Sequence, residues 1–202
     1  MNSTARPDIP DHLAHRPIWH GLVIPWVAAW SSEGIITVAN DPIAGRVAVF
    51  TKGRQGRGRP VFGVMNPPRQ RAAVLTGLCQ ICGRSLEDTG WLPNHPKLVE
   101  SFDDKGGQWL LEPPCCQPCA LYSTAACPGI RGTVTDLIEV IEIQPVAQLL
   151  DLTDFIGRLS ERFDDQETPE SHARLNRVMR RYPGGVMGLV RYQITQSQRH
   201  DL

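Results

Sequence analysis

The sequence lacks an apolar run long enough to cross a membrane. Its most apolar stretch, residues 21–30, is interrupted by Pro25 and falls far short of the roughly 20 residues that a membrane-spanning helix needs. The first 17 residues also lack the charged start, apolar centre and small-residue cleavage site of a secretory signal. We therefore expect no membrane contact and a cytoplasmic location.

Motifs that mark common enzyme classes are missing too. The chain has no glycine-rich phosphate-binding motif, no nucleophile elbow and no internal repeat. We therefore predict no catalytic residue and no small-molecule cofactor. An apolar content of 41% and a charged content of 21% are typical of a globular protein, and 18 Gly and 17 Pro predict many turns and short elements.

Acidic residues are absent from residues 42–86, although the whole chain carries 21 basic and 21 acidic residues. Residues 87–170 reverse the sign, with a net charge of −11. The basic block can neutralise the phosphates of a nucleic acid, or it can pair with the protein's own acidic segment. The candidate nucleic-acid-binding residues are Arg46, Lys52, Arg54, Arg57, Arg59, Arg69 and Arg71.

Four of the six cysteines form two C-x2-C pairs. Cys79 and Cys82 make the first pair and Cys116 and Cys119 the second. Reduced intracellular thiols more often bind metals than form disulfides. Four thiolates supply the closed tetrahedral shell of a structural zinc site, and Gly83 suits the tight turn after the first pair. We predict structural zinc, although iron accepts the same ligands.

The two remaining cysteines leave alternatives open. Cys115 is next to Cys116 and is a possible substitute ligand, and Cys127 follows on the helix predicted after the second pair. We interpret both as core residues or as neighbours of the ligands. A thioredoxin-like redox pair fits poorly, because that role needs a single C-x-x-C opening the helix of a βαβ unit.

Alternation, apolar spacing and turn residues predict a mixture of strands and helices. We expect strands over residues 22–30, 35–39, 47–51, 61–65, 90–92, 108–112, 134–143, 146–150 and 186–195. We expect helices over residues 69–76, 118–126, 154–163 and 168–181. We interpret the first two strands as one hairpin closed by residues 31–34, and the next two as a second hairpin around a mobile, solvated loop.

These elements predict an α+β protein with a β-rich N-terminal part, a central treble-clef-like zinc module and a C-terminal helical and β extension. The order of cysteine turn, hairpin and helix is that of a treble clef. We place an extended arm at residues 1–17, an α+β domain at residues 18–163 with the zinc module at about 78–132, and a linker, helix and strand at residues 164–202.

Histidines and tryptophans offer weaker candidates. A treble clef with a nearby histidine invites comparison with HNH nucleases, for which His95 is the candidate base, but no His or Asn arrangement follows Cys119 to hold a second metal. His12, His15 and His20 are too loosely spaced to be assigned a role. Trp26, Trp30 and Trp91 have rings that can stack on bases, although a Trp in an apolar strand is usually a core residue.

The strings HLAHRPIWHGLVIPWVAAWSSE, GRPVFGV, RQRA, LCQICGRSL and EPPCCQPCALYSTAACPGI resemble a family of small, uncharacterised proteins from actinobacteriophages and their actinobacterial hosts. The resemblance covers roughly residues 10–151. Related sequences pair C-x-x-C with a later C-x-x-C or H-x-x-C, followed by Cys-Pro-His or Cys-Pro-Gly, here Cys127-Pro128-Gly129. The resemblance implies a phage or prophage origin and a metal site, and it favours Cys116 over Cys115 as the ligand.

We therefore expect a non-enzymatic phage or prophage accessory protein in the host cytoplasm. It would bind nucleic acid, or a host factor that acts on nucleic acid, through the Arg-rich segment at residues 46–71. One alternative is a protein-binding module that uses the acidic segment. The other is an HNH-like, metal-dependent nuclease.

Overall fold

The computed structural model of the protein describes residues 7–87, 89–95, 98–102, 108–150, 181–182 and 186–202. Strands predominate, accompanied by the helices α1 (Pro67–Thr76) and α2 (Gln117–Ala126). The α+β class predicted from the sequence is confirmed. The predicted helix at residues 154–163 and all but the last residue of the one at 168–181 lie outside the described residues.

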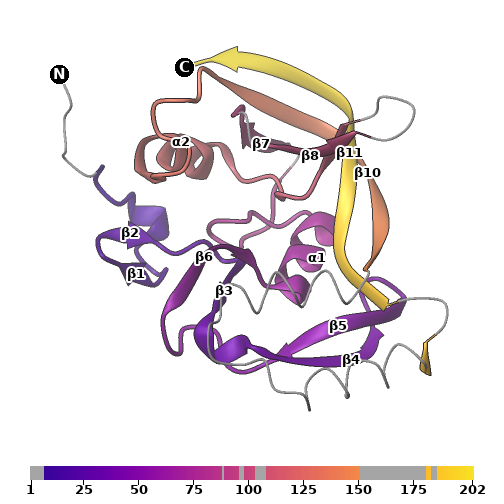
Figure 1. Ribbon diagram of the computed structural model, residues 1–202. Helices are drawn as coiled ribbons and strands as arrows, with labels where there is room; N and C mark the ends of the chain where they lie inside the picture. The colour runs from indigo at the N-terminus through magenta and orange to yellow at the C-terminus, as the bar shows by residue number, and fades with distance from the viewer. Residues whose placement is uncertain (1–6, 88, 96–97, 103–107, 151–180, 183–185) are drawn as a thin grey trace.

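The largest sheet gathers strands from both ends of the chain (Figure 1). Its main path has the order β4-β5-β11-β10-β7, and β9 pairs with both β11 and β8. The final strand, β11, thus lies in the middle of the sheet between β5 and β10. The strands are β4 (Ile35–Asp41), β5 (Arg46–Lys52), β7 (Gly90–Pro93), β8 (Val99–Phe102), β9 (Gln108–Leu110), β10 (Asp136–Leu150) and β11 (Val186–Asp201).

Two small antiparallel pairs complete the strands. β1 (Ile18–Trp19) pairs with β2 (Leu22–Val23), and β3 (Ala28–Trp30) pairs with β6 (Pro60–Met65). The predicted hairpins are wrong, because β3 pairs with β6 whereas β4 pairs with β5. The segment Ser31–Glu33 is not a hairpin turn. It forms a 3-10 helix in which Glu33 accepts a hydrogen bond from the Trp30 amide, and this turn carries the chain from one sheet to the other.

The region predicted as two strands around Pro145 is one strand, β10, of 15 residues. β7 pairs with Leu137–Val140 of β10, which leaves Pro145 beyond the end of that pairing. Among the described residues, β10 is therefore paired at Pro145 on one side, with β11, and a residue without an amide hydrogen is tolerated there. Register shifts along β10 accompany the bend of the long β10–β11 ribbon (Figure 1).

Helix α1 begins at Pro67, two residues before the predicted start at residue 69, and ends at Thr76 as predicted. The side chain of Asn66 accepts a hydrogen bond from the Arg69 amide at 3.3 Å, and prolines occupy the first turn. Gly77 ends the helix in the left-handed conformation, with φ of 65°.

A buried glutamine ties α1 to the sheet. The amide nitrogen of Gln70 donates to the carbonyls of Leu111 and Val190, and its amide oxygen accepts from the Val190 backbone nitrogen at 2.9 Å. Gln70 is completely buried. These three hydrogen bonds satisfy buried polar groups that would otherwise lack a partner. Gln70 therefore fixes the position of the helix on β11.

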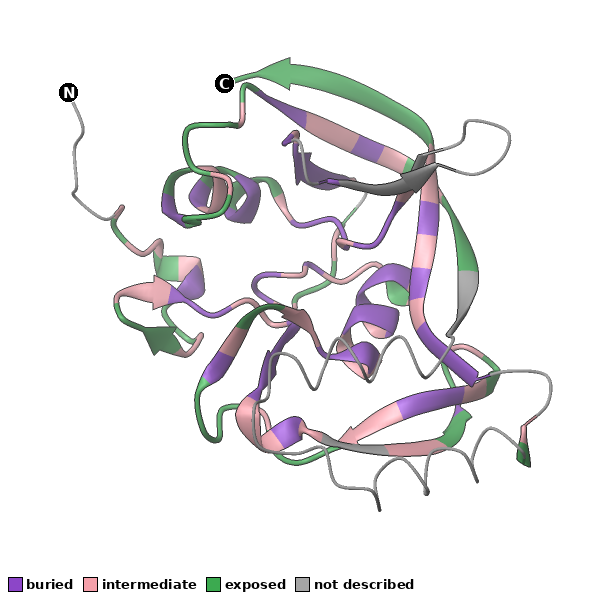
Figure 2. Ribbon diagram, in the orientation of Figure 1, coloured by how far each residue is buried: buried purple, intermediate pink, exposed green. Residues whose placement is uncertain are grey.

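The apolar interior has two main parts, which we call the cysteine core and the sheet core. Neighbouring residues of β7 divide between them, Trp91 in the first and Leu92 in the second, so the two cores lie on opposite faces of this strand. Buried residues line both (Figure 2). The cysteine core comprises Leu13, Val23, Cys79, Ile81, Cys82, Trp91, Cys115, Cys119, Ala120, Tyr122, Ala126 and Leu137. The sheet core comprises Ala48, Val74, Leu92, Leu98, Leu110, Val140, Met187, Val190 and Tyr192.

Neither helix in the described part of the chain is long and apolar enough to cross a membrane.

Candidate metal centre and basic surface

The four cysteines of the two C-x2-C pairs come together. The sulfur atoms of Cys79, Cys82, Cys116 and Cys119 all lie within 4.8 Å of one another. A tetrahedral shell with metal–sulfur bonds of about 2.3 Å has sulfur–sulfur edges of about 3.8 Å, so small shifts would complete it. Three of the four residues are buried and Cys116 is half-buried. The cluster can hold a metal ion.

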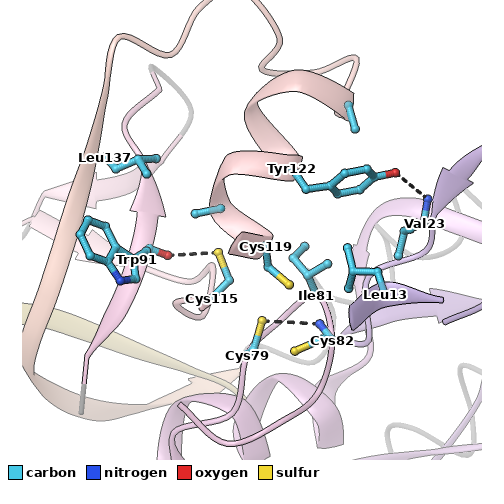
Figure 3. Packing of buried hydrophobic residues seen from close by; sticks show 12 residues of the cluster. Leu13, Val23, Cys79, Ile81, Cys82, Trp91, Cys115, Cys119, Tyr122 and Leu137 are labelled. Atoms are coloured by element: carbon cyan, nitrogen blue, oxygen red, sulfur yellow. Dashed lines mark hydrogen bonds between the residues drawn. The ribbon is translucent and has the colours of Figure 1, made fainter. Parts of the chain in front are cut away.

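Two tight local structures bring these sulfurs together, and Figure 3 shows three of them, those of Cys79, Cys82 and Cys119. In the first, the Gly83 amide donates to the Cys79 carbonyl, and Gly83 has φ of 78°. A Cβ at Gly83 would lie 2.7 Å from the Trp26 ring, so both the backbone and the packing require glycine. In the second, Cys116 is the N-cap of α2 and Cys119 lies in its first turn.

Hydrogen bonds among the thiols make their ionisation unequal. The pKa of Cys82 is lowered because the other three cysteines, Cys116 first, stabilise its thiolate. The pKa of Cys119 is raised, chiefly by its hydrogen bond to Cys116. The pKa of Cys116 is lowered as well and that of Cys79 is raised, so two of the four thiols give up their protons more readily than the other two. A metal ion bound here replaces those protons, as thiolate ligation requires.

The N-terminal arm lies directly on this cluster. His12 Nε2 is 3.3 Å from the sulfur of Cys119, and Leu13 is completely buried in the cysteine core. The pKa of Arg16 is lowered by burial and by Arg69, whereas nearby cysteine sulfurs act in the opposite direction. Sequence reasoning assigned His12 no role, because 107 residues separate it from Cys119 and only the fold brings the two together.

The two extra cysteines stay outside the cluster. Cys115 is completely buried, and its sulfur lies 3.2 Å from the Trp91 carbonyl, to which its thiol donates. Burial raises the pKa of that thiol, which keeps it protonated and inert. Cys127 is exposed at the C-cap of α2, so the expectation of a core residue is wrong for it.

His95, the candidate nuclease base, is buried. Its side chain is 3% exposed and its Nε2 lies 3.5 Å from the Glu112 carboxylate. A general base must reach the proton that it abstracts, and the burial of His95 gives no such access. Among the described residues, no second group of three or more His, Cys, Asp or Glu side chains is placed to hold a metal.

Two of the seven candidate nucleic-acid-binding residues face inward. Arg69 forms an ion pair with Glu33 at 2.6 Å, and Arg71 forms one with Asp41, also at 2.6 Å. The Arg71 side chain is 0% exposed and also lies 5.0 Å over the Phe50 ring. These arginines hold α1 against β4 and the 3-10 turn before it, and they present no charge to a partner.

The other five lie on the surface. Their side chains are exposed, and within the described residues none of them has an acid at salt-bridge distance. We call this set the basic surface; it consists of Arg46 and Lys52 of β5 and Arg54, Arg57 and Arg59 of the following loop.

The loop that carries three of these arginines has an anchored backbone. Ser32 Oγ donates to the Arg54 carbonyl at 3.0 Å, and the Arg59 amide donates to Ser31 Oγ at 3.0 Å. Gln55 Nε2 donates to the Trp26 carbonyl at 3.1 Å. The sequence predicted a mobile loop. In the structure, the side chains are solvated but the backbone is hydrogen-bonded to the 3-10 turn. The two serines that make these bonds lie 22 and 28 residues away in sequence, so local composition does not reveal the anchoring.

Comparison of the chain with protein-family models, with curated proteins and with solved structures finds no match in any of the three.

Proposed function

We propose that this protein is a non-enzymatic nucleic-acid-binding accessory protein of a phage or prophage, braced by a structural zinc ion and acting in the host cytoplasm. The observation that carries the proposal is the basic surface. Its five cationic side chains point into solvent without acidic partners among the described residues, on a strand and a loop whose backbone is hydrogen-bonded in place.

Free charge and an ordered backbone both favour phosphate recognition. Each phosphate neutralised by a Lys or Arg releases condensed counterions, which supplies affinity that falls as salt rises. A loop that is already ordered loses less conformational entropy on binding. Arg69 and Arg71 lack the free charge, because they are paired with acids and turned inward, so they are not part of the proposed binding surface.

We propose zinc as the ion of the cysteine cluster, although four thiolates also accept iron. Four thiolates form a closed shell with no open position, which is the pattern of structural rather than catalytic zinc. The treble-clef interpretation is supported by the order of the parts: a cysteine turn, an antiparallel bridge between Trp91 and Cys115, and then α2 with the second cysteine pair. In this role zinc holds together the first cysteine turn, the start of α2 and, through His12, the N-terminal arm.

The test is an anisotropy titration of a labelled oligonucleotide over a series of salt concentrations. The variant Arg54→Ala/Arg57→Ala/Arg59→Ala should bind more weakly, and its log–log salt slope should fall by about 0.7 to 0.9 for each phosphate that the variant no longer neutralises. The matched control is Arg131→Ala/Arg181→Ala/Arg199→Ala, which removes the same charge from exposed positions elsewhere. Equal weakening of binding in both variants would show that binding depends on the net charge of the protein and not on the loop. Unchanged binding in the loop variant would contradict the proposal and turn attention to the acidic segment.

A further inference from the structure

Strand β6 carries a bulge next to the basic surface. Ala28 of β3 lies opposite Met65 of β6, and the adjacent Ala29 lies opposite Val61. Three residues of β6, 62–64, are therefore inserted between these two pairs. Gly63, with φ of 78°, supplies the left-handed backbone conformation that lets this segment loop out.

The bulge presents an aromatic ring to solvent. The side chain of Phe62 is 47% exposed, although a ring of this size normally contributes to a core. Figure 2 marks exposed residues both in the loop that leads into β6 and in the middle of β6. Trp30 and Trp91, which the sequence offered as stacking residues, are buried, and Trp26 packs on Gly83. Phe62 is thus more exposed than any of the three tryptophans that the sequence offered.

Phe62 follows the basic loop closely along the chain. It follows Arg59 by three residues, so their Cα atoms are at most about 11 Å apart at 3.3 to 3.6 Å per residue. The Arg59 backbone is held by two hydrogen bonds with Ser31, one at each of its polar groups. The cations and the ring therefore belong to one short, anchored stretch of chain.

An aromatic ring beside a row of cations distinguishes the forms of nucleic acid. Bases in a duplex are stacked on one another, so a side chain can reach a base face only at the cost of unstacking a base step. In a single strand the faces are open, and proteins that bind single strands combine a cationic track with aromatic stacking platforms.

We infer that Phe62 stacks on an unpaired base and that the basic surface takes single-stranded nucleic acid in preference to duplex. This inference rests on the proposed function and names its substrate class. The arginines supply affinity that depends on salt, and Phe62 supplies affinity that depends on an open base face.

The probes are labelled oligothymidylate and oligouridylate of about 15 nucleotides, near the upper end of the site sizes of single-strand binders, and a duplex of the same length. The full-length protein should bind both single strands more tightly than the duplex. A preference between the two single strands then identifies DNA or RNA as the ligand.

Phe62→Ala should weaken single-strand binding by about 5-fold to 150-fold, the range that corresponds to losing one stacked base. It should leave the duplex affinity and the salt slope unchanged, and Phe62→Trp should retain single-strand binding. Leu121→Ala, which removes another exposed apolar side chain, on α2, is the matched control and should change nothing.

Equal affinities for single strand and duplex, or single-strand binding that survives in Phe62→Ala, would overturn this inference. The proposed function would still stand if the loop-arginine variant bound more weakly. Absence of binding to every probe at low salt would contradict both. Because Phe62 is exposed, its variants should melt at the same temperature as the unmodified protein, which verifies that the binding effect is local.

Discussion

The cysteine core and the sheet core bring together different kinds of side chain. In the cysteine core, four sulfurs from two distant segments converge, and their protons must leave before a metal can bind. In the sheet core, α1 is fixed by side chains that are charged or polar from the start, namely Gln70 and Arg71. The cysteine cluster can therefore hold an ion from outside, whereas α1 is fixed to the sheet by hydrogen bonds and an ion pair within the described part of the chain.

Loss of the metal should have the largest effect, and it should be confined to one region. Structural zinc in small modules contributes about 10 to 16 kcal/mol of apparent binding free energy. We expect Cys116→Ser, or chelation, to raise amide hydrogen exchange in α2 and in the turn after Cys79, while β5, β10 and β11 remain protected. Cys127→Ser, which removes an exposed thiol, is the control. Uniform loss of protection across both cores would erase the distinction between them.

Arg71→Ala should have the largest effect on the sheet core. Removing one partner of a buried ion pair leaves a buried charge uncompensated and lowers the free energy of unfolding by about 3 to 5 kcal/mol. Chemical denaturation measures this loss, and the metal content should not change. Arg46→Ala, at an exposed position, should stay within about 0.5 kcal/mol. A similarly small loss in Arg71→Ala would show that the Asp41 pair does not hold α1 in place.

His12→Ala sharpens the comparison within the cysteine core. Removing a group that hydrogen-bonds to a metal ligand typically lowers the metal affinity by about 10-fold to 100-fold. We therefore expect faster metal transfer to a chromogenic chelator from this variant than from the unmodified protein. His15→Ala, at an exposed position on the same arm, should match the unmodified protein. Equal transfer rates in the two variants would show that His12 does not affect how tightly the cysteine cluster holds the metal.

The smallest effect is a pH dependence of the sheet core. Binding to Arg71 and to the amides of Ala44 and Ile43 holds the pKa of Asp41 below its ordinary 3.8, although burial opposes this. A carboxyl with a lowered pKa stabilises the fold above its unfolded-state pKa, and that contribution is lost as the pH falls through the folded-state value. Denaturation of the unmodified protein should therefore become easier below about pH 4. In Asp41→Asn this part of the acid sensitivity should be missing, and identical acid profiles would argue against the pair.

The sequence predicted the parts of the molecule that depend on local chemistry. The end of α1 at Thr76 was predicted, although its start was placed two residues late, and the four clustered cysteines follow from the spacing within their pairs. The pairing of the strands could not be predicted from the sequence. Alternation shows which residues of a strand share a face, but not which other strand lies beside that strand.

The inward arginines and His12 were missed for a related reason. In the sequence, Arg69 and Arg71 have the pattern of solvated charges, because their partners Glu33 and Asp41 belong to other elements. The partner of His12 lies on α2, and only the fold brings the two together. Likewise, the exposure of Phe62 follows from a register shift between β3 and β6 that no local pattern encodes.

Metal analysis of the purified protein tests most directly whether the cysteine core is built around an ion. We predict about one zinc ion per chain, lost in Cys116→Ser and retained in Cys115→Ser. Protein that contains no metal and still protects α2 and the N-terminal arm from hydrogen exchange would contradict this prediction.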